Sequence, residues 1–452
     1  MRVAVIGAGI VGVTTAFELA CDGHEVSCFE RGGSVAGQTS FANAGVVAPG
    51  YVTPWAAPGM TGKVLRHLFS RHTPVRLHPT LVPSTLAWLV RWRRASRLSV
   101  YQANRARMQR LAGYSRERLH HVTDLLRLDY ERSTGYLVLF RSAKDWALAQ
   151  PGLDLLASGG TRFRVLDAAG CIEHEPGLDR ATELHAGIHL PDDEVGNCRQ
   201  FATLLREQAQ RLGVRFVFHT DVERLEAGAQ PTVVHRRVGA DADAPARPPR
   251  SRHAPSDTVE APTTQPMPQE PVSDGFDAVV VCAAIGSKAL LRPLRIKLPL
   301  LAVHGYSITA PLREHPEHPN HGPRSGLMDE RYKVAITRLG NRVRVAGGAE
   351  IGGVPDRLNE AALATLHKVL HDWFPGSAMV SQVQAWKGAR PMLPDGPPVL
   401  GASGADGIWL NLGHGASGWA LACGSARVLA DLLAGRTPAI DIEGLGIERL
   451  RG

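Results

Sequence analysis

The first thirty residues constrain the fold of this chain more than any other segment. Residues 3–6 are a short β-prone run, residues 7–12 read Gly-Ala-Gly-Ile-Val-Gly, and a helical stretch continues to Ala20. A second β-prone run, residues 25–30, ends on Glu30. A glycine-rich turn between a strand and a helix is typical of a unit that binds the pyrophosphate of a dinucleotide. The order therefore predicts a Rossmann-like domain for an ADP-containing dinucleotide.

Each part of this turn has its own expected role. Gly7 lets the chain turn, Gly9 lets the backbone approach the pyrophosphate, and Gly12 lets the helix pack closely on the strand. The helix N-terminus offers free N–H groups to the phosphates, and Glu30 accepts hydrogen bonds from the ribose. A signal peptide is the alternative reading of the apolar residues after Arg2, but nothing after Ala20 resembles a cleavage site.

Two further segments are suited to a long polar cofactor. Residues 39–45 read Thr-Ser-Phe-Ala-Asn-Ala-Gly, and residues 413–419 read Gly-His-Gly-Ala-Ser-Gly-Trp between a β-prone run and a helix. The second segment could direct N–H groups toward a flavin ring. A solvated loop and a generic tight turn explain the same residues. NAD and FAD therefore both remain open from these residues alone.

Blocks along nearly the whole chain resemble the FAD-dependent D-amino-acid dehydrogenases of the small-subunit type. This family lies within the D-amino-acid oxidase and glycine oxidase superfamily. The resemblance rests on residues 39–45, 49–59, 191–196, 304–309, 329–338, 347–350, 386–399 and 411–425. One departure is that the family's threonine in G-H-G-T-x-G-W is Ala416 here, with Ser417 after it. Tuning of the flavin by that hydroxyl is therefore in question.

The resemblance implies non-covalently bound FAD and a two-part fold of the α/β (α+β) class. We expect a Rossmann-like FAD domain of the glutathione-reductase type and a discontinuous substrate domain built on an antiparallel sheet. Val222 is expected to contact adenine through its backbone, and Gly286 to pass close to the cofactor. The expected cofactor-binding residues are Val3, Ile6, Gly7, Ala8, Gly9, Ile10, Val11, Gly12, Glu30, Arg31, Thr39, Ser40, Asn43, Ala44, Gly45, Val222, Gly286, Gly413, His414, Gly415 and Gly418.

The domains are expected to interleave along the chain. The FAD domain is assigned residues 1–50, 195–240, 276–295 and 396–452, and the substrate domain residues 51–194 and 297–395. Residues 241–275 are rich in proline and poor in large apolar side chains. Such a segment cannot bury enough surface to offset its ordering entropy, so we expect a disordered insertion.

Oxidation of an amino acid requires an anchor for its carboxylate. A guanidinium provides two parallel charge-assisted hydrogen bonds, and Arg390 occupies the position of the superfamily's substrate-binding arginine. Tyr306 and Tyr332 are the expected phenol partners of the substrate, although a buried tyrosine with a satisfied hydroxyl is the alternative for each. Strand alternation over residues 332–337 ranks Lys333 lower. His414 is expected to act through its backbone, and no histidine spacing indicates a metal site.

Composition limits the class of protein. The chain has 452 residues, 44% hydrophobic and 21% charged, which predicts two or three globular domains. No apolar run is long enough to span a membrane, and the six cysteines are scattered without a C-x-x-C pair, which favours a reducing compartment. The net charge of +8 favours anionic partners. Residues 86–94 resemble a basic amphipathic helix for an anionic membrane surface, or a domain helix with a solvated face.

The sequence therefore predicts oxidative deamination of D-amino acids, with D-alanine an expected substrate, to 2-oxo acids and ammonia. Hydride passes from Cα to FAD, and the resemblance implies a quinone as the acceptor and a cytoplasmic location on the inner face of the bacterial inner membrane. A dehydrogenase of D-hydroxyproline or another secondary amine is the alternative. An NAD(P)-dependent enzyme leaves residues 411–425 unexplained. A nucleic-acid-binding protein lacks any supporting motif.

Overall fold

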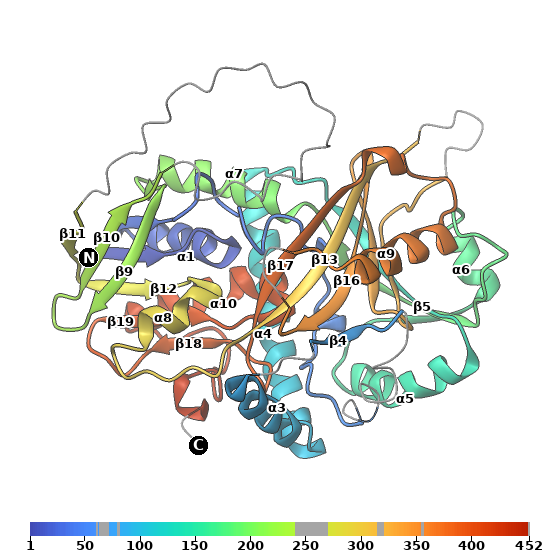
Figure 1. The fold of residues 1–452 in the computed structure, drawn as a ribbon, viewed down its shortest axis with the longest axis horizontal. Helices are drawn as coiled ribbons and strands as arrows, with labels where there is room; N and C mark the ends of the chain where they lie inside the picture. Colours follow the sequence, from blue (N-terminus) through green and yellow to red (C-terminus); the bar gives the residue numbers. More distant parts are fainter. Residues whose placement is uncertain are drawn as a thin grey trace, which may run out of the picture.

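The computed structural model describes residues 1–59, 62, 72–78, 82–239, 270–313, 321–353 and 357–450. Two large sheets lie side by side, and the sheet that holds the N-terminal strand also holds the strands nearest the C-terminus (Figure 1). Most of the predicted insertion, residues 241–275, falls outside the described residues. Its last residues form strand β11 (Val272–Gly275), which pairs with the preceding strand β10, so the insertion is shorter than predicted.

The first sheet has six strands and carries the glycine-rich turn. All neighbouring pairs are parallel except β18 with β19. The strand order is β18 (Val399–Ala402), β19 (Ile408–Leu412), β12 (Ala278–Val281), β1 (Arg2–Ile6), β2 (Glu25–Phe29) and β8 (Arg215–Val217). The central strand β1 brings the turn to the carboxyl edge of the sheet, where parallel α/β sheets bind ligands.

Each face of this sheet is covered by a different layer. On one face, Val3, Val5 and Val280 pack against three helices: α1 (Ile10–Cys21), α7 (Cys198–Arg211) and α10 (Gly418–Leu433). On the other face, Ala4 and Val279 pack against a three-stranded sheet, the short helix α8 and a C-terminal turn. These are β9 (Thr220–Glu226), β10 (Thr232–Arg237), β11, α8 (Ser287–Leu291) and η6 (Ile447–Leu450).

The segment that leads to Val222 is divided between two strands. β8 ends at Val217 in the first sheet and β9 begins at Thr220 in the three-stranded sheet. His219 between them has a φ of +51°, a left-handed conformation that breaks the strand. Val222 therefore lies outside the six-stranded sheet, paired with His235 of β10.

The second sheet is mixed and mainly antiparallel. β14 pairs with β5, and β16 with β4, in parallel; the remaining pairs are antiparallel. Its order is β17 (Gln384–Met392), β13 (Leu301–Pro311), β16 (Arg342–Ile351), β15 (Val334–Leu339), β14 (Gly326–Asp329), β5 (Ser133–Phe140), β7 (Ala186–Val195) and β3 (Val46–Val47), with β4 (Val75–Leu77) beside β16 and β6 (Arg164–Asp167) beside β7.

Helices cover the second sheet and join it to the first. α9 (Glu360–Trp373) packs on the face formed by β13, β15 and β16. The other helices here are α3 (Pro83–Ala95), α4 (Leu98–Leu126), α5 (Ala143–Ser158) and α6 (Ala168–His174), and the remaining short turns are η1 (Pro49–Tyr51), η3 (Ala284–Gly286), η4 (Val380–Gln382) and η5 (Gly415–Ser417). Among the described residues, no helix is both long and apolar enough to cross a membrane.

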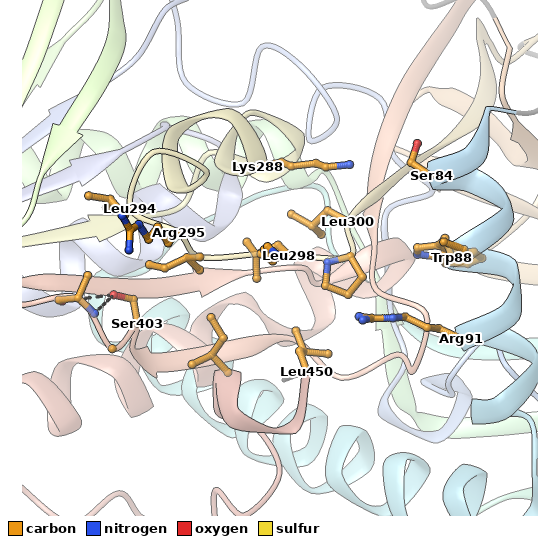
Figure 2. Close-up of a pocket in the computed structure, with 17 residues that line it drawn as sticks. Ser84, Trp88, Arg91, Lys288, Leu294, Arg295, Leu298, Leu300, Ser403 and Leu450 are labelled. Atoms are coloured by element: carbon orange, nitrogen blue, oxygen red, sulfur yellow. Dashed lines mark hydrogen bonds between the residues drawn. The ribbon is translucent and has the colours of Figure 1, made fainter. Parts of the chain in front are cut away.

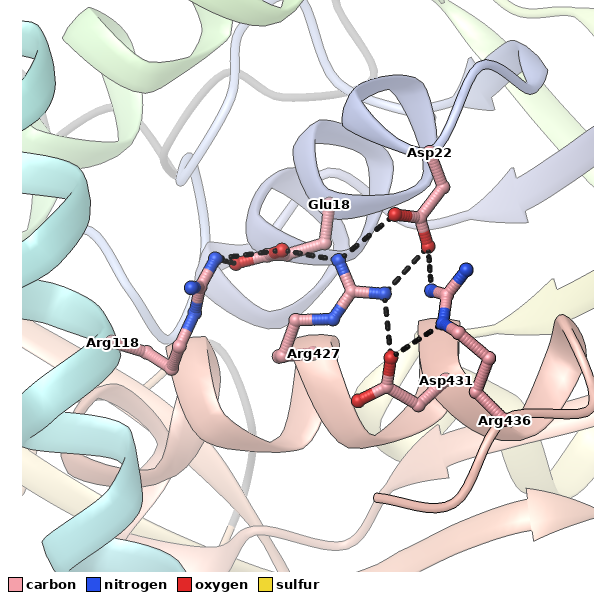
Figure 3. Close-up of polar contacts among 6 residues, drawn as sticks. All are labelled: Glu18, Asp22, Arg118, Arg427, Asp431 and Arg436. Carbon is pink, nitrogen blue, oxygen red and sulfur yellow. Dashed lines mark hydrogen bonds and ion pairs between the residues drawn. The ribbon is translucent and has the colours of Figure 1, made fainter. Parts of the chain in front are cut away.

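A buried ion-pair network fastens α1 to α4 and α10 (Figure 3). Glu18 is 2% exposed and accepts hydrogen bonds from Arg118 at 2.7 Å and from Arg427 at 2.9 Å. Arg427 also binds Asp22 and Asp431. Helices from three distant parts of the chain are therefore held in register behind the glycine-rich turn.

Candidate active site

The glycine-rich turn is closely packed at two of its glycines. A Cβ on Gly12 would lie 1.8 Å from the carbonyl oxygen of Gly7, so only glycine allows α1 to start this close to β1. Gly7 has a φ of +99°, and a Cβ there would lie 3.0 Å from the carbonyl oxygen of Cys282. Gly9, in contrast, has open space up to Ser40 Oγ at 3.6 Å. The turn therefore leaves its free backbone at the middle glycine, where a pyrophosphate would approach.

Glu30 lies beside this turn, as the sequence predicts. Its carboxylate accepts backbone hydrogen bonds from Ala8 at 2.7 Å and from Gly32 at 2.9 Å. A carboxylate has about four acceptor positions, so two remain for ribose hydroxyls. The two backbone hydrogen bonds hold the carboxylate in place at the end of β2 and leave acceptor positions free.

Residues 39–45 connect the turn to the second sheet. Ser40 Oγ accepts a hydrogen bond from the Ile10 backbone at 3.1 Å, and Thr39 donates to the Ala389 carbonyl at 2.7 Å. At the other end, Thr337 donates to the Ala44 carbonyl at 2.7 Å and Arg344 donates to the Asn43 carbonyl at 3.3 Å. This loop therefore joins the dinucleotide turn to β17, which carries Arg390, and at its other end to β15 and β16.

The loop at residues 413–418 closes the same region from the C-terminal side. His414 forms an isolated β-bridge with Met392, two residues after Arg390. A Cβ on Gly413 would lie 2.5 Å from the side chain of Leu393. Burial lowers the pKa of His414 to about 3, and its Nε2 lies 3.0 Å from Ser425 Oγ. His414 is therefore neutral near pH 7, and so low a pKa makes it a weak proton acceptor.

Arg390 is partly buried on β17 and has no carboxylate partner among the described residues. Its Nη1 donates a hydrogen bond to the Gly348 carbonyl at 2.7 Å. The side chain covers Gly305 of β13, where a Cβ would lie 2.3 Å from Nη2. Burial lowers the pKa of Arg390 to about 10, so it still carries its charge at pH 7. A buried cation without an anion is suited to bind a carboxylate.

Residues 2–432 match the family described as FAD dependent oxidoreductase. The chain belongs to this family. Over 99% of its length it is 42% identical to a D-amino acid dehydrogenase of Rhizorhabdus wittichii, which is covered completely. A D-amino acid dehydrogenase of Agrobacterium fabrum is 40% identical, with 99% of each chain covered. These matches confirm the resemblance stated from the sequence.

Solved structures of other enzymes share the fold. Glycine oxidase from Geobacillus kaustophilus superposes with a TM-score of 0.70 at 20% identity, covering 100% of both chains. L-proline dehydrogenase from P. horikoshii superposes with a TM-score of 0.67 at 15% identity, covering 99% of this chain and 97% of that one. The predicted fold class is confirmed, and FAD is the cofactor of this oxidoreductase.

The residues present fit FAD. Close-packed glycines at positions 7 and 12, the fixed Glu30 carboxylate and the loops at 39–45 and 413–418 line one continuous region of the oxidoreductase. Of the other expected cofactor residues, Val3, Ile6 and Ala8 are buried, Val11 is half-buried and Arg31 is exposed. Gly286 lies in η3, where a Cβ would meet the Ala283 side chain at 3.8 Å. Gly418 opens α10, and Gly415 has a φ of +57° beside Met392.

Tyr306 and Tyr332 are not brought together with Arg390. Gly305 faces Arg390, so the next residue, Tyr306, points to the opposite face of the strand, toward α9. There its hydroxyl donates to Glu350, and its ring and that of Tyr332 line a cavity of about 10 Å³ under α9. The expected contact of these two tyrosines with the substrate finds no support in this geometry.

Tyr332 also precedes the strand in which the sequence placed it. β15 begins at Val334, and Lys333 has a φ of +52°, which ends the strand pattern. The Tyr332 ring lies between Arg141 at 5.0 Å and Lys368 at 5.6 Å. Lys333 pairs with Glu330 and donates to Tyr51. Tyr332 and Lys333 therefore both contact other side chains of the protein just before β15.

The sequence reasoning missed the residues that make room for Arg390. Gly305 lies under the guanidinium, and Gly348, with a φ of +71°, turns its carbonyl toward it. A glycine inside an otherwise apolar strand often marks a close approach of another group, and Gly305 carried that signal. Trp88 of α3 donates to the Met392 carbonyl at 3.2 Å and carried no such signal. Among the described residues, no cluster of His, Cys, Asp and Glu could hold a metal.

Proposed function

We propose that this oxidoreductase deaminates D-amino acids to 2-oxo acids and ammonia. The observation that carries the proposal is the charged, anion-free guanidinium of Arg390, on the strand to which both cofactor loops are tied. The relatives of about 40% identity that are named D-amino acid dehydrogenase supply the handedness and the substrate class.

The chain's own residues would hold the amino acid through its carboxylate. Arg390 binds the two carboxylate oxygens, and its bond to Gly348 fixes the guanidinium in one orientation. The neutral His414 leaves the substrate ammonium to lose its proton to solvent. Bound non-covalently, FAD supplies the acceptor for the hydride that leaves Cα. The resulting imino acid hydrolyses in water.

The visible spectrum of the purified holoprotein tests this proposal. Under anaerobic conditions, D-alanine should bleach the flavin bands and L-alanine should not. Bleaching by L-alanine alone would overturn the handedness, and a protein that takes up no FAD would overturn the reaction.

Oxidation of D-hydroxyproline or another secondary amine is the second candidate. The structural likeness to L-proline dehydrogenase favours this candidate, because that enzyme has the same fold and is named for a substrate that is a secondary amine. In the same spectral experiment, bleaching by D-proline or D-hydroxyproline but not by D-alanine would select this candidate.

We also propose that α3 lies on an anionic membrane on the cytoplasmic side, where a quinone would take the electrons. Val82, Leu86 and Val90 are 56%, 50% and 53% exposed and follow one another at helical spacing, with Arg93 and Arg94 close by. Wild-type protein should float with vesicles that contain phosphatidylglycerol, and the double variant Leu86→Ser/Val90→Ser should stay behind. Equal flotation of both would overturn the contact.

The division into two domains remains our proposal as well. The six-stranded sheet draws on residues 1–50, 195–240, 276–295 and 396–452, and the mixed sheet mainly on residues 51–194 and 297–395. α4, although within 51–194, packs on α10 through Leu111 and Leu421. We therefore assign α4 to the junction between the domains.

A further inference from the structure

We infer that a cleft between α3 and the segment leading into β13 binds one anionic phospholipid. The cleft has a volume of about 700 Å³. α3 forms one wall, residues 294–300 form the floor, and Ser403 and Leu450 lie on the far side (Figure 2). Its lining includes neither Arg390 nor any of the expected cofactor residues, although Leu300 on its floor adjoins Gly413. The inference goes beyond the proposed reaction and extends the proposed membrane contact of α3.

The charge of the cleft is entirely positive. Its lining carries four cations and no acidic residue. The cations are Arg91, Lys288, Arg295 and Lys297. All four are exposed, and within the described part of the chain none of them forms an ion pair. Figure 2 shows Lys288 extending toward Ser84 of α3, while Arg91 extends from α3 toward Leu450. A phosphodiester between them would meet cations from opposite walls.

The floor of the cleft is apolar. Trp88, Leu298 and Leu300 are 3%, 5% and 5% exposed, and Leu294 and Ile296 are half-buried beside them. The apolar surface still open to solvent in the cleft comes from the half-buried Leu294 and Ile296 and the exposed Ala87, and a free inorganic anion would leave it uncovered. A hydrocarbon chain would cover it, with a gain of about 25 cal/mol for each Å² of apolar surface removed from water. Cations above an apolar floor therefore favour an anionic amphiphile.

The position of the cleft favours a membrane lipid as that amphiphile. Ser84, Trp88 and Arg91 line the cleft from one side of α3, and the exposed stripe of Val82, Leu86 and Val90 lies around the same helix. A lipid in the cytoplasmic leaflet of a membrane that touches this stripe would be next to the mouth of the cleft. The four cations would then select lipids with a net negative head group.

Calorimetric titration of the FAD-loaded full chain with monomeric dihexanoyl-phosphatidylglycerol tests the inference. We expect one molecule to bind, and the double variant Lys288→Ala/Arg295→Ala to bind roughly tenfold or more weakly. A tenfold change in affinity corresponds to about 1.4 kcal/mol, which the loss of two charge-assisted hydrogen bonds exceeds. Arg93→Ala/Arg94→Ala is the control with the same loss of charge. Both of its residues are exposed on α3 and neither lines the cleft, so its affinity should be unchanged.

Four results would overturn the inference. They are no binding, equal affinity for dihexanoyl-phosphatidylcholine, equal affinity for glycerol phosphate or inorganic phosphate, and equal weakening by the two double variants. The second would show that charge is irrelevant, and the third that the cleft takes a simple anion. Because the lipid is monomeric, this experiment does not depend on vesicle binding, so failure of the cleft and failure of the membrane contact are distinguishable.

Discussion

Arg390 donates a hydrogen bond to the carbonyl oxygen of Gly348 across two antiparallel strand pairs, β17 with β13 and β13 with β16. The bond exists because β16 has an irregular register opposite residues 304–306, which places Gly348 at a bulge with a φ of +71°. The guanidinium is thereby fixed over Gly305 while its remaining N–H groups stay available.

Replacement of Arg390 should therefore affect substrate binding more than folding. For Arg390→Lys we expect kcat/KM for D-alanine to fall by roughly thirtyfold to a thousandfold, because a point charge replaces a planar two-donor group and about 2–4 kcal/mol of binding is lost. The flavin content should be unchanged. Steady-state kinetics and the visible spectrum measure both. Arg342→Lys, which changes an arginine paired with Glu131, is the control and should keep its kcat/KM.

An unchanged kcat/KM in Arg390→Lys would show that another group anchors the carboxylate. A parallel loss of flavin would show that Arg390 acts on the cofactor region instead.

Gly12→Ala should abolish FAD binding. The added Cβ would lie 1.8 Å from the Gly7 carbonyl oxygen, so α1 must move away from β1 and the turn must open. The ratio of flavin to protein after reconstitution, together with the far-UV circular dichroism, measures the effect. Gly113→Ala in α4 is the matched control, because nothing lies within 4 Å of its added Cβ.

Glu30→Gln supplies a second variant if Gly12→Ala fails to fold. It preserves the shape of the side chain beside Ala8 and removes the charge. We expect FAD affinity to fall by roughly tenfold, since hydrogen bonds to a charged acceptor are worth about 1.5–3 kcal/mol. Full FAD affinity in both variants would contradict the placement of the dinucleotide.

The local structure of the cofactor turn follows from sequence, but the faces of the second sheet do not. Residues 3–30 combine a β-prone run, glycines and a helical run, and this local pattern is enough to predict β1, α1 and β2. Alternation in β13 predicts that Tyr306 and Ile308 share a face. It cannot predict whether that face meets α9 or the cofactor, because the choice depends on a helix fifty residues later in the chain and on the bulge at Gly348.

Asp193 should make the protein less stable as pH rises. The carboxyl group is 2% exposed, and burial raises its pKa to about 7. A carboxyl whose folded pKa is raised contributes stability that is complete below its unfolded pKa, near 3.8, and is lost as pH rises through about 7. Asp193→Asn should therefore gain about 2–4 kcal/mol over wild type between about pH 4 and pH 8. Urea unfolding at both pH values measures the gain.

The neighbouring Asp192 provides a control for this prediction. Arg162 holds the pKa of Asp192 below its usual value, so Asp192 is already charged over the same pH range. Asp192→Asn should leave the pH dependence of the unfolding free energy unchanged. Two variants with the same slope would contradict a buried neutral Asp193.

Glu18→Gln should destabilise the junction of α1, α4 and α10. Glu18 is almost fully buried and accepts from Arg118 and Arg427, so its loss leaves two guanidinium groups facing a neutral amide (Figure 3). Breaking one partner of a buried ion pair costs about 3–5 kcal/mol, and the remaining bonds of Arg427 to Asp22 and Asp431 place this variant at the lower end. Urea unfolding measures the loss.

An exposed ion pair that also involves α4 provides a comparison for the loss of unfolding free energy in Glu18→Gln. Glu443 is 84% exposed and pairs with Arg107 at 4.0 Å, so Glu443→Gln should change the unfolding free energy by less than about 1 kcal/mol. A double-mutant cycle of Glu18→Gln with Arg118→Gln then separates the interaction energy of the ion pair from the cost of burying each changed side chain. If the pair itself is stabilising, the double variant will lose less than the sum of the two single variants. An additive cycle would mean that Arg427 alone neutralises Glu18, and that α4 is held on α1 and α10 by apolar packing.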